Sequence, residues 1–269
     1  RRLLKDNEAD PLAIWTSDLD DKQQANTESI DDILDELEQK FIGLQSVKDE
    51  IRELAYEFED EMGRSRRLGI SQKSKLHHML FVGGPGTGKT TIARYMSRVF
   101  KALGVVTHGD EVYECRGLDL KGSFLGQTKD RVNELFENAA GKVVLIDEAY
   151  SLYDPESNAQ DQYGQEAIDA LVGCITDTTN QDIVLILAGY PKKMDSFLNA
   201  NPGLSRRFPT TIKFPNYTAD ECVEIFKMFA SQERYEFEDQ VQDCLATLED
   251  LFESLSRRSD FGNAGEVAN

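Results

Sequence analysis

The sequence has few basic residues for the number of its acidic ones. Its 269 residues include 30 Lys and Arg against 49 Asp and Glu, which gives a formal net charge of -19 at pH 7. A surface with this excess of negative charge repels phosphate backbones and anionic lipid headgroups. The charge balance therefore disfavours both a nucleic-acid partner and a membrane partner.

Cysteine and long apolar runs are also scarce. The four cysteines lie far apart, with no Cys-x-x-Cys pair and no His at ligand spacing; they are Cys115, Cys174, Cys222 and Cys244. This pattern predicts neither a zinc site nor a disulfide framework, and free thiols are typical of an intracellular, reducing compartment. No apolar run approaches the ~20 residues that span a bilayer, and the N-terminal "RRLLKDNEAD" has no apolar signal core. Because the chain begins without Met, we expect it to be a piece of a longer protein.

Three stretches of different pattern divide the chain. Residues 1–28 are acidic and polar with no sustained period, which predicts a linker or arm. Residues 29–215 begin with two amphipathic helical patterns and continue with apolar runs that alternate with helical ones. This alternation is typical of an α/β domain with a parallel sheet covered on both faces. Residues 216–269 show helical patterns alone, and we expect a small all-helical lobe that is truncated at its C-terminus.

Hydrophobic periodicity sets the expected elements. The helices are predicted at about 29–41, 47–58, 90–103, 129–140, 165–176, 218–229 and 239–255, and the strands at 77–83, 112–115, 143–146 and 183–188. Thr218 is expected to cap the first helix of the C-terminal lobe. The basic, serine-bearing residues 64–75 are interpreted as a connection before the first strand.

A glycine-rich sequence follows the first predicted strand. "GGPGTGKT" has the spacing G-x-x-x-x-G-K-[ST], and its fixed positions are Gly83, Gly88, Lys89 and Thr90. The glycines let backbone N–H groups wrap around phosphate oxygens, and the N-terminus of the following helix adds the positive end of its dipole. Lys89 is expected to neutralise the outer phosphates and Thr90 to hold Mg²⁺. The alternative is an ordinary glycine-rich turn, which the strand before and the helix after disfavour.

Two adjacent carboxylates end the strand in "KVVLIDEAYSL". A phosphate cradle needs an acid on its metal side, and that acid comes from a strand end at the same edge of the sheet. Asp147 is predicted to reach the Mg²⁺, directly or through water, and Glu148 to orient and activate the attacking water. The alternative is that one of these acids merely caps the following helix.

Seven segments occur in the order and spacing of AAA+ ATPases: "FIGLQSVKDEI", "GGPGTGKTTIAR", "FLGQTKDRV", "VVLIDEAYSL", "YGQEAID", "LILAGY" and "NPGLSRRF". In detail the chain resembles the CbbX/CfxQ branch of that family, which includes red-type Rubisco activase and stage V sporulation protein K, from about Ile30 to its end. The resemblance implies a P-loop NTPase core with a five-stranded parallel sheet of order 5-1-4-3-2 and a helical C-terminal lid. It also implies ATP and Mg²⁺ as cofactors.

The resemblance assigns nucleotide contacts residue by residue. Ile42, Gly43 and Leu44 match the segment that touches the adenine, although the pattern alone indicates a helix break with two core residues. The last lid helix is implied to line the adenine side as well. The residues implied to contact the nucleotide are Ile42, Gly43, Leu44, Pro85, Gly86, Thr87, Gly88, Lys89, Thr90, Thr91, Gly262, Asn263 and Ala264.

Two further segments have roles in the family outside the nucleotide site. Phe124, Leu125 and Gly126 match the loop that faces the central pore of a ring and grips a polypeptide; the alternative is that Phe124 is a core residue. Arg206 and Arg207 match the arginine finger presented to the ATP of a neighbouring subunit, and Arg207 fits better because it lies directly before Phe208. Either arginine could instead form a surface ion pair.

The chain departs from the family pattern at two places. Many AAA+ proteins have a polar Asn or Thr after the strand that ends near residue 188, whereas this chain has Gly189 and Tyr190. The lid helix of the branch commonly opens with G-N-A-R and supplies an Arg to the phosphates, whereas Gly265 stands in that position here. We therefore expect ATP binding to survive and hydrolysis to be slow or to depend on other subunits.

Two hypotheses of function follow. The first is an ATP-driven protein-remodelling motor that works as a homo-oligomeric ring, with six subunits expected, or as tandem AAA+ domains, and acts on a protein substrate. The second is a nucleotide-dependent scaffold domain of a larger protein, with weak hydrolysis. A nucleic-acid translocase is a weaker third hypothesis because of the acidic charge. The residues encode no Rubisco contact, and the compartment within the cell is not resolved.

Overall fold

The structure is a computed structural model that describes residues 28–69, 77–122, 124, 126–153, 161–233, 242–256 and 261–267. Nearly all of the predicted acidic arm, together with Leu125 of the predicted pore loop, lies outside the described residues. Among the side chains that the structure describes, Cys115, Cys174 and Cys222 are free thiols.

Five strands form one parallel sheet. They are β1 (Met79–Gly83), β2 (Val112–Arg116), β3 (Val143–Asp147), β4 (Val184–Gly189) and β5 (Thr210–Phe214). Their order across the sheet is β2-β3-β4-β1-β5, and every neighbouring pair is parallel. This order confirms the one implied by the family resemblance. The fifth strand was not assigned from hydrophobic pattern, because its exposed Thr and Lys residues interrupt the apolar run.

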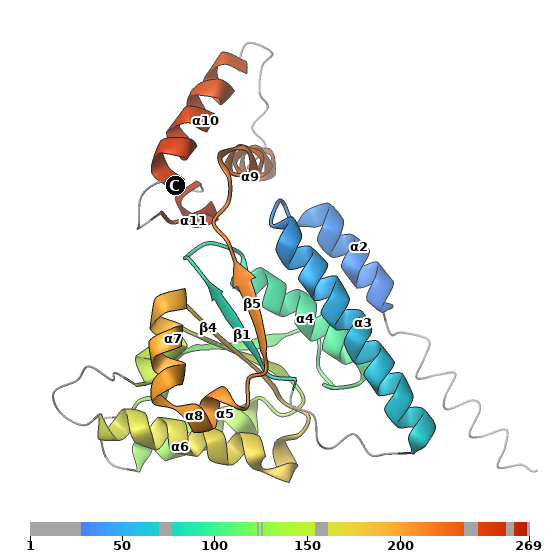
Figure 1. Ribbon diagram of the computed structural model, residues 1–269, viewed down its shortest axis with the longest axis vertical. Helices are drawn as coiled ribbons and strands as arrows, with labels where there is room; N and C mark the ends of the chain where they lie inside the picture. The colour runs from blue at the N-terminus through green and yellow to red at the C-terminus, as the bar shows by residue number, and fades with distance from the viewer. Residues whose placement is uncertain are drawn as a thin grey trace, which may run out of the picture.

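Helices cover both faces of the sheet (Figure 1). One layer contains α2 (Ile30–Lys40), α3 (Gln45–Leu68) and α4 (Lys89–Leu103), and the other contains α5 (Gln127–Asn138), α6 (Gln162–Thr176), α7 (Pro191–Ala200) and α8 (Pro202–Ser205). Alternate side chains of β1 explain the two layers: Met79 and Phe81 pack in the first core, and Leu80 and Val82 pack in the second. Short 3-10 turns η1 (Gly117–Leu120), η2 (Ala149–Leu152) and η3 (Thr178–Asn180) complete this domain.

Helix α2 matches its predicted range, whereas α3 extends beyond its predicted C-terminal end. Ser29, where the helical pattern was predicted to begin, caps α2 by accepting a hydrogen bond from the backbone N–H of Asp32 at 3.1 Å. The expected connection at residues 64–75 is wrong in its first part, because α3 continues to Leu68. Gly69 ends the helix with a φ of 61°, a left-handed conformation that glycine adopts without strain.

The C-terminal lobe is helical where it is described. It contains α9 (Ala219–Gln232), α10 (Gln242–Ser256) and the short α11 (Ala264–Val267), and these three are called the lid helices below. Thr218 caps α9 as predicted, in a reciprocal capping box with Glu221. Figure 1 shows the lid helices beyond the carboxyl ends of β1 and β5, which is the end of the sheet where the glycine-rich sequence lies.

Candidate nucleotide-binding site

A hollow of about 470 Å³ lies at the carboxyl edge of the sheet, between the core domain and the lid helices. The residues that line it are Gly83, Pro85, Gly86, Thr87, Gly88, Lys89, Thr90, Thr91, Asp147, Glu148, Gly189, Tyr190, Phe229, Ala264 and Gly265. The fold therefore brings the glycine-rich loop, the carboxylate pair and the end of the lid together. These three segments are widely separated in the sequence, and it is the parallel sheet that aligns the first two.

The glycine-rich loop has a shape that only glycine permits. Gly86 and Gly88 have φ values of 64° and 83°. A Cβ atom on Gly88 would lie 2.5 Å from the ring of Phe41, and one on Gly86 would lie 2.2 Å from the carbonyl oxygen of Gly262. Thr87 is buried and donates a hydrogen bond from Oγ1 to the carbonyl of Gly84 at 2.9 Å. The hydrogen bond of Thr87 within the loop and the close approach of Gly262 from the lid therefore favour one conformation of the loop.

Lys89 carries the positive charge of the loop. Its ammonium group donates hydrogen bonds to the carbonyl oxygens of Gly83, at 3.2 Å, and of Gly84. Burial lowers the pKa of Lys89 from its ordinary value, and the nearby Asp147 opposes that change. A partly desolvated cation enclosed by loop backbone attracts an anion strongly, so the loop fits a phosphate chain.

The carboxylate pair lies where the backbone turns sharply at the end of β3. Asp147 is the last residue of the strand, and its Oδ1 accepts a hydrogen bond from the backbone N–H of Glu148 at 2.9 Å. Glu148 has φ 48° and ψ 42°, which is the left-handed region, and its side chain forms no cap on η2. The backbone therefore turns sharply at Glu148, and both Asp147 and Glu148 line the hollow. The helix-cap alternative has no support in this geometry.

Mg²⁺ fits the oxygen atoms offered at this edge. Thr90 and Asp147 both line the hollow, and Mg²⁺ is usually held by one or two protein oxygens together with substrate phosphates and water. Within the described part of the chain, no group of three or more His, Cys, Asp or Glu could hold a metal ion by itself. The donor set is therefore one that suits Mg²⁺ only in company with a phosphate chain.

The predicted adenine segment lies beside the lid rather than in the wall of the hollow. The backbone N–H of Leu44 donates to Oε1 of Glu221 at 2.9 Å, and Gly43 passes so close to the same side chain that a Cβ would lie 2.4 Å from it. Leu44 is buried, and neither it nor Ile42 is among the residues that line the hollow. This segment fixes the start of α9, and adenine contact remains a prediction for it.

The lid is tied to the loop by one buried side chain. Asn263 has no exposed surface; its Oδ1 accepts from the backbone N–H of Tyr217 at 2.9 Å, and its Nδ2 donates to the carbonyl of Pro85 at 3.1 Å. The backbone N–H of Ala264 donates to the carbonyl of Gly86 at 3.2 Å. Ala264 lines the hollow, whereas Gly262 and Asn263 do not. The sequence pattern gave no sign that Asn263 makes these contacts.

Gly265 opens onto the hollow. It is exposed, and a Cβ atom added there would have no atom within 4 Å. The position where the family resemblance leads us to expect an Arg therefore presents no steric obstruction to a side chain. Phe229 of α9 also lines the hollow; its helical spacing had indicated only an apolar face, so this contact was missed.

Arg206 and Arg207 lie after α8, outside the residues that line this hollow. Arg206 is exposed, and Arg207 donates a hydrogen bond to the carbonyl of Gly203 at 3.2 Å. Neither guanidinium forms an ion pair with an acid in the described ranges. The ion-pair alternative for these two residues has no support there, and they do not reach the nucleotide hollow of their own chain.

Phe124 is on the surface. Its exposed fraction is 73%, so the alternative that it is a core residue is wrong. The backbone N–H of Gly126 donates to Oε1 of Glu166 at 3.0 Å, which ties the C-terminal end of this loop to α6.

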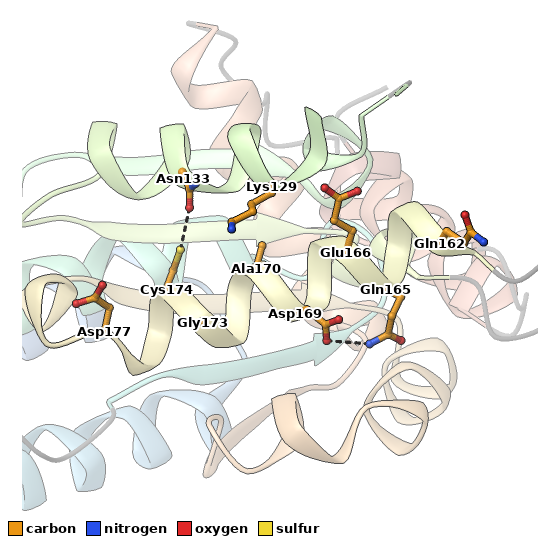
Figure 2. A pocket seen from close by; sticks show the side chains of 10 residues that line it. All are labelled: Lys129, Asn133, Gln162, Gln165, Glu166, Asp169, Ala170, Gly173, Cys174 and Asp177. Carbon is orange, nitrogen blue, oxygen red and sulfur yellow. Dashed lines mark hydrogen bonds between the residues drawn. The ribbon is translucent and has the colours of Figure 1, made fainter. Parts of the chain in front are cut away.

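A second and larger hollow, of about 680 Å³, lies between α5 and α6 (Figure 2). Helix side chains line it, namely Lys129, Asn133, Gln162, Gln165, Glu166, Asp169, Ala170, Gly173, Cys174 and Asp177. It includes no strand end and no glycine-rich loop, and acids outnumber its single Lys. Size alone would favour it, but the smaller hollow has the chemistry of a phosphate site.

No helix in the described ranges is both long and apolar enough to span a membrane.

Comparisons with known proteins identify the family of the chain. The family model of the ATPase family associated with various cellular activities (AAA) matches residues 79–216, and that of the AAA lid domain matches residues 218–269. The chain is 38% identical over 240 residues to the CfxQ homolog of Cyanidium caldarium, covering 89% of this chain and 81% of the relative.

Two other relatives are similar to the same extent. The chain is 37% identical over 243 residues to the chloroplastic ribulose bisphosphate carboxylase/oxygenase activase of Cyanidioschyzon merolae, covering 89% of this chain and 79% of the relative. It is 37% identical over 238 residues to the CbbX protein of Cereibacter sphaeroides, covering 88% and 74% respectively. The chain belongs to the AAA+ ATPase family and, within it, to the CbbX/CfxQ branch.

Proposed function

We propose that this chain binds ATP with Mg²⁺ and hydrolyses it to ADP and phosphate, and that hydrolysis drives the remodelling of a protein partner. The observation that carries the proposal is the convergence of Lys89, Thr90, Asp147 and Glu148 on one hollow at the carboxyl edge of the sheet. Phosphoryl transfer needs little from a protein beyond positioning and charge stabilisation, and these four residues supply both.

Each side chain has a distinct part in the proposed reaction. Lys89, which is already surrounded by loop carbonyls, moves its hydrogen bonds to the outer phosphates and neutralises them. Thr90 and Asp147 would hold Mg²⁺, which when bound would supply positive charge to the phosphate oxygens. Glu148 orients the attacking water and accepts its proton as the bond to the terminal phosphorus forms. Its place in the lining of the hollow, next to Asp147, supports this role.

The arginines imply a second copy. Arg207, with Arg206 beside it, lies away from the hollow of its own chain, so its charge can serve hydrolysis only at the site of a neighbour. A contact in which one face of a subunit meets a different face of the next is head-to-tail, and such contacts form a ring when the rotation between subunits closes. We therefore propose a homo-oligomeric ring, with six subunits as the expected size, or tandem domains that meet in the same way.

Coupling between hydrolysis and movement is proposed to run through the lid. Asn263 and Ala264 bond directly to the glycine-rich loop, so a change of phosphate contacts in that loop alters the support of the lid. In a ring each lid movement shifts the neighbouring core and its exposed Phe124. Phe124, with Leu125 and Gly126, is proposed to grip a polypeptide segment of the partner.

The partner is proposed to be a protein in an intracellular, reducing compartment. One relative is named as an activase of ribulose bisphosphate carboxylase/oxygenase. No contact in this chain indicates that it acts on the same substrate. The net charge of -19 favours a partner surface rich in Lys and Arg and disfavours nucleic acid.

Gly265 favours one alternative, a nucleotide-dependent scaffold that hydrolyses ATP weakly. The position opens onto the hollow but offers no side chain to the phosphates. The complete set formed by Lys89, Asp147, Glu148 and Arg207 favours the motor.

Replacing Glu148 with Gln separates these two functions. For a motor we expect the Glu148→Gln variant to bind ATP within a few-fold of the unchanged chain and to lose about 10²- to 10⁴-fold in turnover, because the amide cannot accept the proton of the attacking water. Steady-state phosphate release and a fluorescent-ATP titration measure the two quantities. Glu137→Gln, an exposed change on α5, is the matched control and keeps full turnover. Equal turnover in the two variants would contradict the motor.

Phe124→Ala tests the grip on a polypeptide. We expect the variant to lose most of the ATP-dependent retention of fluorescently labelled, unfolded casein, because the exposed ring supplies the apolar contact. Leu118→Ala removes another exposed apolar side chain, on η1, and is expected to leave retention unchanged. If both variants retain casein as well as the unchanged chain does, Phe124 has no part in gripping the substrate.

Gly265→Arg tests whether the lid limits hydrolysis. The added side chain meets no atom near its Cβ and points from α11 at the edge of the hollow. We expect turnover to rise by about tenfold, corresponding to ~1.4 kcal/mol of added transition-state stabilisation. Gly63→Arg on α3 adds the same charge where a Cβ is also unobstructed, and it should change nothing. An unchanged or reduced rate in Gly265→Arg, with Gly63→Arg normal, would show that the missing lid Arg is not what limits this chain.

A further inference from the structure

Tyr150 contacts the carboxylate that is proposed to activate water. It lies on η2, two residues after Glu148, and its hydroxyl donates a hydrogen bond to Oε1 of Glu148 at 3.2 Å. The side chain is half-buried. Burial and the neighbouring Glu148 raise the pKa of Tyr150 above its ordinary value. The hydroxyl therefore keeps its proton at neutral pH and remains a hydrogen-bond donor.

The ring of Tyr150 occupies the space that a side chain at the end of β4 would need. A Cβ atom added to Gly189 would lie 2.8 Å from Cδ1 of Tyr150 and 2.8 Å from Sδ of Met194. Many AAA+ proteins place a polar Asn or Thr just after this strand, so the absence of one here has a physical reason. Gly189 and Tyr150 are complementary, because the large residue needs the small one.

Neighbouring groups hold the Tyr150 ring in place. The ammonium of Lys193 lies 4.6 Å from the centre of this ring and 5.4 Å from that of Tyr190, and the two ring centres are 5.9 Å apart. Cation–π and ring–ring contacts of this geometry favour one orientation of the ring. A hydroxyl on a fixed ring is a rigid donor, whereas one on a mobile side chain loses entropy each time it bonds.

We propose that Tyr150 is a positioning residue for hydrolysis, which takes the place of the polar residue that other AAA+ proteins carry after β4. This inference rests on the proposed ATPase function. Tyr150 holds Oε1 of Glu148, so that the other carboxylate oxygen faces the attacking water and accepts its proton. Tyr150 itself transfers no proton and touches no reacting atom.

Tyr150→Phe removes the hydroxyl and keeps the ring that packs on Gly189. We expect kcat for ATP to fall about tenfold, the size expected for one hydrogen bond to a charged group. KM, the affinity for ATP measured by a fluorescent-ATP titration, and the thermal unfolding midpoint are expected to stay unchanged. Tyr153→Phe, which removes a hydroxyl three residues later on the same segment, is the matched control and should keep the full rate.

A second background shows whether Tyr150 acts through Glu148. In the Glu148→Ala chain, single-turnover rates followed over hours should be the same with and without the added Tyr150→Phe change, because the acceptor is gone. A normal or raised kcat in Tyr150→Phe overturns the inference, as does an equal loss in the Glu148→Ala background. If the unchanged chain binds ATP but does not turn it over under any condition, it is the proposed ATPase function that fails.

Discussion

The candidate site depends on the close approach of the glycine-rich loop to the end of the lid. Gly86 passes so near the carbonyl of Gly262 that no side chain fits between them, and the buried Asn263 joins Pro85 to Tyr217, which lies just before α9. Because the Asn263 side chain is buried, breaking its hydrogen bonds without replacement costs free energy. The loop that would hold phosphates is thus also a support of the lid, and any ligand that reshapes one reshapes the other.

Local patterns predicted most of the core correctly. Strands β1, β3 and β4 are apolar runs bounded by turns, and the cap at Thr218 and the loop around Lys89 are short motifs whose chemistry is complete within a few residues. These features could be read from the sequence because their determinants are local. The strand order came from the family resemblance, since hydrophobic pattern alone does not distinguish neighbours in a buried parallel sheet.

Contacts between distant segments could not be predicted in this way. The fit of Tyr150 against Gly189 joins η2 to β4, and the bonds of Asn263 join the start of α11 to the loop after β1. Each residue is ordinary in its own segment, and only the fold reveals its partner. The end of α3 was predicted wrongly for a different reason. The last part of this helix is a run of polar residues, which gives no apolar stripe facing the core, although it is compatible with a helix that Gly69 ends.

The central claim is that the hollow holds the phosphate chain of ATP together with Mg²⁺. Calorimetric titration of ATP into the chain, with Mg²⁺ and with EDTA, tests it most directly, using Lys89→Ala for comparison. The account predicts saturable binding at one site per chain that Mg²⁺ strengthens and that Lys89→Ala weakens by at least about tenfold, since a partly buried cation is lost from the loop. Binding of equal strength in the two chains, or no binding to the unchanged chain, would contradict it.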